Sequence, residues 1–387
     1  MKYRVVSRCT QGAFRYQAWP TVTKGEDGTL YLGTSGHRLD HICPFGKDLM
    51  YVSYDQGDTW SAPMIINDTW LDDRDAGMLA WGEGNLLLTW FNHAPETFKK
   101  WDPFVDTRPH YAVGNPLALG MRKMWEALPE EERKVGSFTK ISRDNGKTWS
   151  EPRVAPVTSP HGPCRLSDGS LFWLGTLNKA AHDTGVAAKK SVQNSSDLAQ
   201  TDLDGGGNGG NNIFAFRSFD DGETWELVSH APAPEGAEGY CCEPHAIQLK
   251  DGTILAGVRY HWSKGHGNRK IFTFRSKDGG KTWSEAKFVD GWGCPPHFLE
   301  HSSGAVILVY GKRCEVMGQF VRVSYDGGVT WSEETRLGPE APDWDQGYPS
   351  SVELDGGDIL TVFYQKCPGD KFNSLHSVRW NLDELKK

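Results

Sequence analysis

Several ionisable side chains stand at the starts or ends of short apolar segments, where they could meet and do chemistry. Glu243 opens one such segment, and Arg259 closes the segment that follows it. Tyr348 opens a later segment, while Arg38 and Arg313 each close one. A carboxylate can take a proton from a phenol, and a guanidinium can hold a carboxylate through two parallel hydrogen bonds. These residue types point to acid–base chemistry on a small anionic substrate.

Three histidines follow prolines at similar positions, in Pro160-His161, Pro244-His245 and Pro296-His297. If they converge, they could bind a metal or supply a base, but they could equally hydrogen-bond loop backbone or substrate hydroxyls. The eight cysteines show no CxxC pair or other metal-ligand spacing. We therefore assign the histidines to substrate binding and predict neither a metal nor a cofactor.

An eight-residue string, Ser-x-Asp-x-Gly-x-Thr-Trp, occurs five times along the chain. The five copies, called Asp boxes below, span residues 53–60, 142–149, 218–225, 276–283 and 324–331. The aspartate of a box, such as Asp55, can accept hydrogen bonds from the backbone of a turn. The glycine, such as Gly57, can take the positive φ of a tight turn. We interpret the boxes as structural turns rather than as catalytic sites.

A second repeat precedes the first, and consists of a turn of the Asp-Gly kind followed by a short apolar strand. It is recognisable six times, beginning near residues 26, 82, 166, 249, 303 and 354. Each unit reads as four antiparallel strands, with the Asp box between the third and fourth. The chain is therefore predicted to be an all-β protein, a six-bladed β-propeller.

The sixth unit has no box, so its outer strand has to come from elsewhere. We expect the N-terminal segment 3–8 to supply it, because closure by both chain ends removes an exposed sheet edge. Residues 1–387 would then form one domain.

Two insertions, about 95–137 and 177–212, interrupt the repeat between the second and third strands of their blades. The first carries a helical pattern over 117–134, which predicts a helical insertion in blade 2. The second ends in six residues, 205–210, that are glycine apart from one asparagine, and reads as a mobile loop. Both are expected on the face opposite the Asp boxes, where function would sit.

The composition agrees with a globular β protein, with 24% charged residues, 38% hydrophobic residues, 16 Trp and 44 Gly. A net charge of −8 argues against nucleic acid or a membrane surface as partner. No apolar run has the length of a signal peptide or a membrane-spanning helix, so we expect a cytoplasmic protein. The oligomeric state stays open.

The Asp boxes, the six units and the spacing of Glu243, Arg259 and Tyr348 together resemble the sialidase (neuraminidase) superfamily, over nearly the whole chain. The resemblance implies an exo-glycosidase that releases a terminal acidic sugar, sialic acid or similar, from an acidic oligosaccharide or glycoconjugate. It also implies that Tyr348 is the nucleophile, Glu243 its base and Asp40 the acid. A neutral phenol suits a substrate that carries a carboxylate, because a carboxylate nucleophile would meet a like charge.

The resemblance further implies that arginines hold the substrate carboxylate. Arg259 matches the family's pattern, whereas Arg313 stands a few positions earlier than usual and Ala18 occupies the place of the first arginine. Arg38 or Arg74 could therefore help to bind the substrate carboxylate in a different arrangement. Further candidate contacts to the sugar are His161, His245, His297, Asp75 and Gln346.

Two other functions remain open on the same fold. The first is a hydrolase or lyase acting on uronic-acid-containing or related glycans, with the three histidines in its site. The second is a glycan-binding propeller without catalysis, which predicts affinity without turnover. Within the sialidase reading, the role of acid could also fall to His41, Asp48 or Asp75 instead of Asp40.

Overall fold

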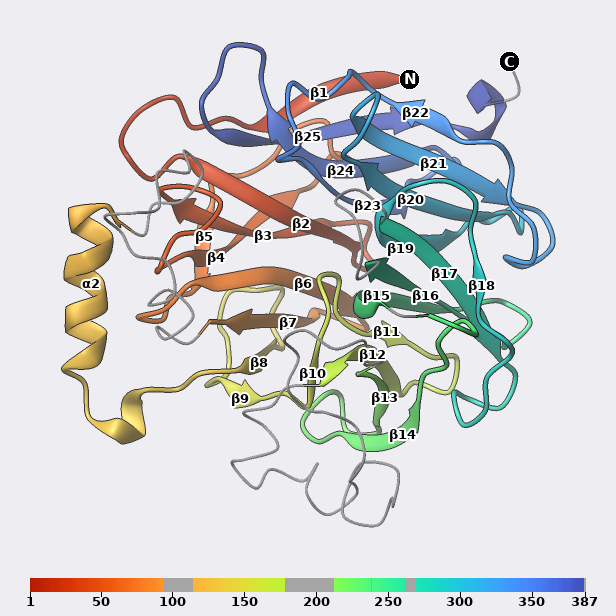
Figure 1. Ribbon diagram of the computed structural model, residues 1–387, viewed down its shortest axis with the longest axis horizontal. Coiled ribbons are helices and arrows are strands. Elements are labelled where there is room, and N and C mark those ends of the chain that lie inside the picture. Colours follow the sequence, from red (N-terminus) through yellow and green to blue (C-terminus); the bar gives the residue numbers. More distant parts are fainter. Residues whose placement is uncertain (94–113, 178–211, 238, 262–268, 386–387) are drawn as a thin grey trace.

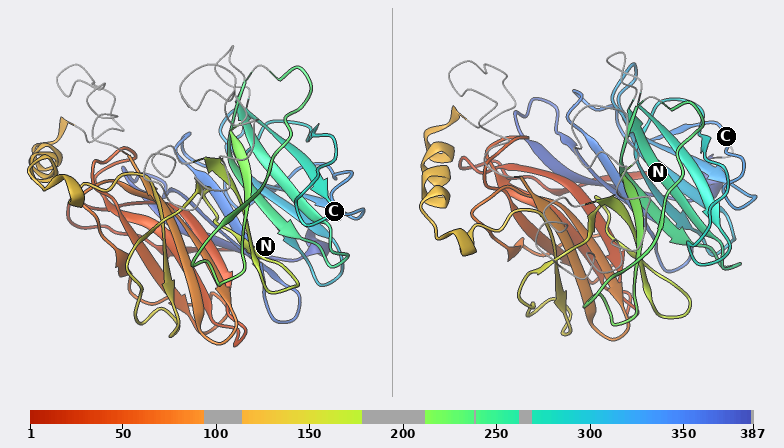
Figure 2. Two further views of the ribbon diagram at one scale, coloured as in Figure 1. Left: turned by 90° about the horizontal axis from the view of Figure 1, so that it is seen from below. Right: turned by 60° about the horizontal axis from the view of Figure 1, so that its bottom comes forward.

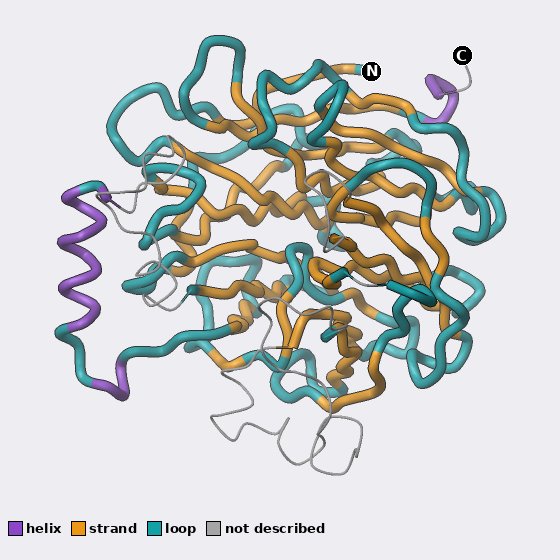
Figure 3. The backbone as a smooth tube through the Cα atoms, viewed as in Figure 1, coloured by secondary structure: helices purple, strands orange, loops and turns teal. Residues whose placement is uncertain are grey.

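The computed structural model describes residues 1–93, 114–177, 212–237, 239–261 and 269–385. It contains six antiparallel sheets arranged around a common centre (Figure 1). The prediction of an all-β, six-bladed β-propeller is confirmed. Helices are confined to the edge of the molecule, while strands and turns form its body (Figure 3).

Each sheet grows from the centre outward. The innermost strands are β2 (Tyr16–Lys24), β6 (Asp73–Trp81), β15 (Tyr240–Gln248), β19 (Cys294–Glu300) and β23 (Gly347–Glu353). In blade 3 the innermost strand is split into β10 (Val157–Thr158) and β11 (Cys164–Arg165), which both pair with β12. The second strands are β3 (Leu30–Arg38), β7 (Asn85–Asn92), β12 (Leu171–Leu177), β16 (Ile254–His261), β20 (Val306–Lys312) and β24 (Ile359–Lys366).

The outer half of each sheet follows the same order. The third strands are β4 (Lys47–Ser53), β8 (Ser137–Ser142), β13 (Ile213–Ser218), β17 (Arg269–Ser276), β21 (Gly318–Ser324) and β25 (Asn373–Trp380). The outermost strands are β5 (Met64–Asn67), β9 (Arg153–Val154), β14 (Glu226–His230), β18 (Lys287–Phe288), β22 (Thr335–Leu337) and β1 (Lys2–Ser7). Since β1 pairs antiparallel with β25, the N-terminal segment completes the blade built by the C-terminal strands.

The Asp boxes form compact turns held by their own side chains. In the fourth box, Asp278 accepts hydrogen bonds from the backbone N–H of Thr282 (2.9 Å), the hydroxyl of Thr282 (2.6 Å) and the hydroxyl of Ser276 (2.7 Å). The Thr282 hydroxyl contributes most to lowering the pKa of Asp278 to about 2. Gly57 in the first box has a φ of +82°, as a tight turn requires.

Loss of a box aspartate is expected to weaken the fold. In the third box, Asp220 accepts from the N–H and hydroxyl of Thr224 (2.9 and 2.6 Å) and from the Ser218 hydroxyl (2.8 Å). Asp220→Ala leaves these donors without their partner, so the free energy of unfolding should fall by about 1–3 kcal/mol. Urea unfolding measures the change. Asp290→Ala, at an exposed aspartate without a hydrogen bond among the described residues, is the control and should change nothing measurable.

Six clusters of the hydrophobic core each lie between two adjacent blades, and a seventh lies between the helix α2 (Pro116–Glu126) and blade 1. The cluster between blades 6 and 1 packs Tyr16 and Trp19 of β2 with Tyr348 of β23 and Tyr364 of β24. These large rings are buried, with at most 5% of each exposed. Rigid packing of aromatic rings thus surrounds the inner ends of these blades, where the polar candidates lie.

The helix α2 (Pro116–Glu126) lies at the side of the propeller (Figure 2). It begins at Asn115, whose side chain accepts a hydrogen bond from the N–H of Leu117 (2.9 Å). The helical pattern over 117–134 is wrong in its second half, where only the short 3-10 turn η2 (Glu130–Glu132) forms. Pro129 explains the break, because proline lacks an N–H and disfavours helical backbone in the residue before it.

Ala118 and Met121 of α2 pack against Leu39, Cys43 and Phe45, in the loop that links β3 to β4. The helix therefore supports the loop that carries Asp40 and His41. Most of the second insertion, 177–212, including the expected mobile segment, lies outside the described residues.

Candidate active site

The innermost strands of five blades each contain a β-bulge, seen as a shift in strand register. Four non-glycine residues in these bulges have positive φ angles: Trp19 (54°), Asp75 (56°), Glu243 (48°) and Tyr348 (52°). Left-handed backbone is costly for such residues and a bulge redirects the side chain it carries. The repeated conformation therefore marks equivalent positions in blades 1, 2, 4 and 6 as a candidate site.

Tyr348, Glu243 and Arg259 form one hydrogen-bonded group. The Tyr348 hydroxyl donates to Glu243 Oε1 over 2.7 Å, and Arg259 Nη1 donates to Glu243 Oε2. Arg259 Nη1 also lies 3.3 Å from the Tyr348 hydroxyl oxygen. Tyr348 and Arg259 are 5% and 6% exposed. The structure thus brings together the three residues on which the sequence resemblance depends.

Electrostatics in this group keep the phenol neutral and the carboxylate ionised. Burial, reinforced by the charge of Glu243, raises the pKa of Tyr348 well above its usual value. Burial also tends to raise the pKa of Glu243, but the Arg259 guanidinium and the hydrogen bond from Tyr348 outweigh it and leave that pKa below its ordinary value. A proton therefore rests on Tyr348 and has Glu243 as its nearest acceptor.

Arg313 lies beside this group without a carboxylate partner among the described residues. Its guanidinium donates to the backbone carbonyl of Gln346 (2.9 Å) and to the hydroxyl of Tyr364 (3.0 Å). It also lies over the rings of Tyr348 and Trp344, at 5.7 and 5.8 Å from their centroids. A largely desolvated guanidinium paired only with neutral groups is suited to hold an anion.

A second network, which the sequence reasoning missed, joins blades 6 and 1. The Asp345 carboxylate is 1% exposed and accepts hydrogen bonds from the hydroxyls of Tyr16 (3.0 Å) and Tyr364 (3.2 Å). His41 Nδ1 lies 2.9 Å from Asp345 Oδ1. Burial alone would raise the pKa of Asp345, but His41 and Arg313 hold it below its usual value. The signal in the sequence was an acidic residue, Asp345, two positions before the first strand of blade 6.

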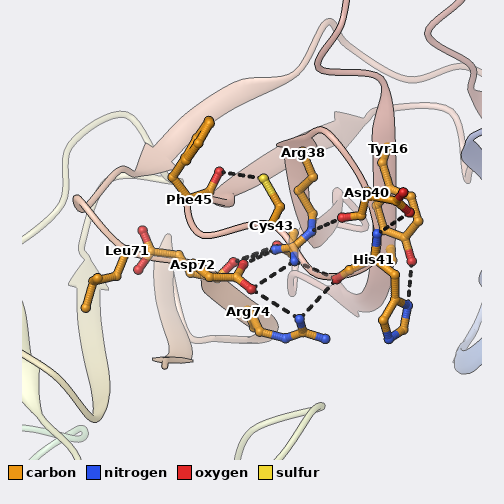
Figure 4. Close-up of polar contacts among 12 residues, drawn as sticks. Tyr16, Arg38, Asp40, His41, Cys43, Phe45, Leu71, Asp72 and Arg74 are labelled. Carbon is orange, nitrogen blue, oxygen red and sulfur yellow. Dashed lines mark hydrogen bonds and ion pairs between the residues drawn. The ribbon is translucent and has the colours of Figure 1, made fainter. Parts of the chain in front are cut away.

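Arg38 and Arg74 flank Asp72 beneath the β3–β4 loop (Figure 4). Arg38 is fully buried and pairs with Asp72 through two hydrogen bonds, while its Nη2 donates to the His41 carbonyl (2.8 Å). Arg74 Nη1 reaches the same carbonyl (3.1 Å) and Asp72 Oδ2 (3.2 Å). Both guanidiniums stack on Trp19. Arg38 thus fixes the loop and has no exposed surface for substrate, contrary to the expectation; Arg74 is 7% exposed.

Asp40 sits in the same loop, as Figure 4 shows. Its Oδ1 accepts a hydrogen bond from the backbone N–H of His41 (2.8 Å), and its carbonyl lies 3.4 Å from Arg38 Nε. The side chain is partly exposed at the edge of the site. Its expected role as the acid stays a prediction.

The three histidines converge, but below the site. The ring centroids of His245 and His297 are 4.4 Å apart, and that of His161 lies 4.8 Å from His297. His161 Nδ1 lies 3.1 Å from the Thr21 hydroxyl, and His297 Nε2 the same distance from the Ser350 hydroxyl. His245 follows the bulge residue Glu243 by two positions, and the three histidines are only 3–7% exposed.

Their assignment to substrate binding is therefore not supported by their placement. Burial lowers the pKa of each of the three histidines, to about 3 for His245. Within the described part of the chain, no group of three or more His, Cys, Asp or Glu side chains is arranged to hold a metal ion. The histidines instead form a neutral layer that closes the axis beneath Tyr348 and Glu243.

Gln346 is also buried, with no exposed surface, and its hydrogen bonds hold residues of the site in place. Its Nε2 donates to the Lys312 carbonyl (2.6 Å), its Oε1 accepts from Gln319 (2.5 Å), and its own carbonyl holds Arg313. The expected sugar contact is thus replaced by a positioning role. Asp75, by contrast, carries its carboxyl at a bulge position equivalent to those of Glu243 and Tyr348.

Comparison with known proteins agrees with the propeller fold. Residues 200–364 match the family described as a BNR repeat-like domain, and residues 140–151 match the BNR/Asp-box repeat. A sialidase from Streptococcus pneumoniae, NanB, shares the fold at 14% identity and a TM-score of 0.63, over 99% of this chain and 71% of its own. The chain is an Asp-box propeller with a sialidase-like fold.

Two further solved structures cover this sialidase-like propeller from end to end. A protein of unknown function from Dyadobacter fermentans is 20% identical with a TM-score of 0.71, over 98% of both chains. An α-L-arabinofuranosidase from Fusarium graminearum is 12% identical with a TM-score of 0.60, over 100% of this chain and 99% of its own. No curated protein matches the sequence. At these identities the likeness concerns the fold.

No helix in the described part of the sialidase-like propeller is long and apolar enough to cross a membrane.

A pair of buried carboxyls beside the site should make the stability of the sialidase-like propeller depend on pH. Burial and the proximity of Asp73 raise the pKa of Asp48, and burial raises that of Asp73 to about 7. Because both folded-state pKa values are raised, the stability they contribute is present at low pH and is lost as the pH rises from about 4 towards 7 and above. Asp48→Asn removes the ionisable group while keeping an acceptor for Asn67.

We expect Asp48→Asn to raise the thermal unfolding midpoint by about 2–4 °C at about pH 8, and by less at about pH 5. Scanning calorimetry at both pH values measures this. Asp290→Asn serves as the exposed control. An equal shift at the two pH values would contradict the assignment to these carboxyls.

Proposed function

We propose that this sialidase-like propeller is a retaining exo-glycosidase that releases a terminal acidic sugar. The observation that carries the proposal is the 2.7 Å hydrogen bond from the buried Tyr348 hydroxyl to Glu243. The other carboxylate oxygen of Glu243 accepts a hydrogen bond from Arg259. This arrangement supplies a nucleophile with a base already in contact. Sialidases are the known exception in which tyrosine replaces a carboxylate nucleophile.

The charge balance of the site supports an acidic substrate. Arg38 and Arg74 share Asp72, and Arg259 is paired with Glu243, whereas Arg313 has only neutral partners among the described residues. A substrate carboxylate beside Arg313 would supply the ion-pair partner that this residue lacks among the described residues. Arg259 and Arg74 could also bind that carboxylate. The sugar could be sialic acid or a related acid, since Ala18 leaves no arginine at the family's first position.

The closed floor of the site supports action on chain ends. The buried layer of His161, His245 and His297 lies beneath the catalytic group, while Trp344 at the rim is 36% exposed. A site closed by buried side chains on this side suits the end of a glycan better than its middle.

In the proposed reaction, the Tyr348 oxygen bonds to the anomeric carbon as its proton passes to Glu243. The bond to the leaving oxygen breaks as a protonated acid of the site, Asp40 in the sequence-based prediction, gives that oxygen a proton. Water then replaces Tyr348 at the anomeric carbon and gives one proton back to this acid, while the proton on Glu243 returns to the phenolate. Two displacements give retention of configuration.

A second candidate is favoured by one observation, the ionised state of Glu243 beside a Tyr348 whose pKa is raised. A carboxylate nucleophile attacking directly would act on an uncharged glycoside, with Tyr348 as a hydrogen-bond donor. The α-L-arabinofuranosidase shows that the fold is compatible with glycosides other than sialosides.

Trapping the covalent intermediate tests the proposal and separates the candidates. The protein would first be assayed on a panel of acidic and neutral glycosides, with product configuration followed by NMR. The matching fluorinated sugar would then be used to inactivate it, and the labelled peptide identified by mass spectrometry. A label on Tyr348 from an acidic sugar is the expected result. A label on Glu243 from a neutral sugar would establish the second candidate instead.

A further inference from the structure

His41, at the edge of the site, is fixed through one ring nitrogen while its other ring nitrogen stays open. His41 Nδ1 lies 2.9 Å from Asp345 Oδ1, whereas Nε2 has no hydrogen-bond partner among the described residues. The side chain is 14% exposed, and Figure 4 shows Nε2 directed away from Tyr16, whose hydroxyl contacts Nδ1. An accessible polar atom held in one orientation is what a binding site uses to orient its ligand.

The surroundings of Asp345 determine which nitrogen of His41 carries the proton. The Asp345 carboxylate accepts hydrogen bonds from the hydroxyls of Tyr16 (3.0 Å) and Tyr364 (3.2 Å). Because an ionised carboxylate can only accept, Nδ1 of His41 must be the donor towards it. Burial, together with nearby arginines, outweighs the charge of Asp345 and lowers the pKa of His41. At neutral pH the ring is therefore neutral, and Nε2 is a hydrogen-bond acceptor.

Trp344 adds a flat apolar surface beside this acceptor. Its ring centroid lies 5.4 Å from that of His41 and 5.8 Å from the guanidinium carbon of Arg313, and the residue is 36% exposed. A sugar ring has apolar C–H faces that can pack on an indole, and hydroxyls around its edge that can donate hydrogen bonds. The pair therefore matches one sugar ring, which would stack on Trp344 and donate a hydroxyl to His41 Nε2.

The pair stands next to the reacting centre. The ring of Trp19 contacts both His41 and Tyr348, with centroids 5.3 and 6.4 Å apart, so one disaccharide could reach from Tyr348 to His41. In the proposed function the terminal sugar lies over Tyr348, with its carboxylate at Arg313. Because buried histidines close the floor of the site, the rest of the glycan would extend over the rim, where Trp344 and His41 lie.

The charges beside the pair favour an uncharged second sugar. The ionised Asp345 contacts His41, and the partly exposed carboxyl of Asp40 belongs to the preceding residue. A carboxylate on the second sugar would meet these acidic groups and the lone pair of Nε2, whereas a hydroxyl would find an acceptor. We propose that His41 and Trp344 form a subsite for a neutral leaving-group sugar, an inference that rests on the proposed function.

Two variants remove the two parts of this subsite. His41→Asn keeps an amide N–H near the place of Nδ1 for Asp345 but has no atom at the place of Nε2, and Trp344→Ala removes the platform. The controls are His37→Asn and Tyr325→Ala. His37 is an exposed histidine of the same blade, and its φ of 50° is tolerated by asparagine. Tyr325 is a 71% exposed ring in the fifth Asp box.

Calorimetry with uncleavable probes measures the subsite independently of turnover. The probes are sialic acid and glucuronic acid, each joined through sulfur either to galactose or to a methyl group. For the acid that binds, the wild type should bind the galactose probe about 10- to 100-fold more tightly than the methyl probe. His41→Asn should reduce this preference by about 3- to 10-fold and Trp344→Ala by about 10-fold. His41→Gln, whose amide oxygen can reach the place of Nε2, should restore part of it.

The outcomes separate this inference from the proposed function. A preference for galactose that survives in both His41→Asn and Trp344→Ala would overturn the subsite, as would a wild type that binds both probes equally or neither. Cleavage of acidic glycosides without that preference would leave the proposed function intact and remove the subsite. A preference that both variants lose and both controls keep, in a wild type that cleaves no glycoside, would support the subsite and overturn the proposed function.

Discussion

Tyr348→Phe is expected to lower kcat on the acidic glycoside by about 10³-fold or more, because the ring stays and the attacking oxygen is lost. Glu243→Gln should have a similar effect, since an amide cannot receive the phenol's proton. The rings of Trp19 and Tyr364 that pack around Tyr348 are unchanged by either substitution. Steady-state kinetics, with thermal unfolding to verify the fold, measures both variants.

The chain contains a matched control for this prediction. Tyr310 is a buried tyrosine whose hydroxyl donates to Glu334 (2.8 Å) and accepts from Arg322 (3.1 Å). This is the same combination of residue types as in the site, but its partners belong to the outer half of blade 5 rather than to the Tyr348–Glu243 group. Tyr310→Phe should therefore leave kcat unchanged. If Tyr348→Phe behaved like Tyr310→Phe while Glu243→Gln lost turnover, Glu243 and not Tyr348 would be the nucleophile.

Arg313→Met is expected to raise KM for the acidic glycoside by about 10- to 100-fold, the value of a charged hydrogen bond of about 1.5–3 kcal/mol. The physical reason is that Arg313 is the guanidinium at the site without a carboxylate partner among the described residues. Comparing the kinetics on the acidic glycoside with those on its methyl ester would measure how much the negative charge of the substrate contributes to binding. The wild type should prefer the acid, and Arg313→Met should not distinguish the two.

Arg336→Met is the control, because Arg336 lies in the same blade and pairs with Glu340 at the exposed surface. It should leave the ratio of acid to ester unchanged. An Arg313→Met variant that kept the full preference for the acid would show that another arginine, Arg259 or Arg74, carries the recognition.

Much of the fold could be predicted because its signals are local. The serine, aspartate, glycine and threonine of an Asp box hydrogen-bond to one another within a few residues, so the turn follows from the string itself. Counting the turns predicts the number of blades. Because the last blade would otherwise expose the unpaired edge of its third strand, the N-terminal strand β1 is predicted to pair with it, as β1 does with β25. The helix in the insertion was misjudged in length because the apolar pattern continues beyond the break at Pro129.

The sequence by itself determined the propeller, its order of strands and which residue types could meet at its centre. Tertiary structure alone decided their depth and their partners, since Tyr348 and Glu243 are 105 residues apart and meet only after ring closure. Bulges shift the register, and one residue of shift turns a side chain to the other face of a strand. For that reason the histidines lie below the site, Arg38 is buried against Asp72, and Asp345 emerges beside the expected residues.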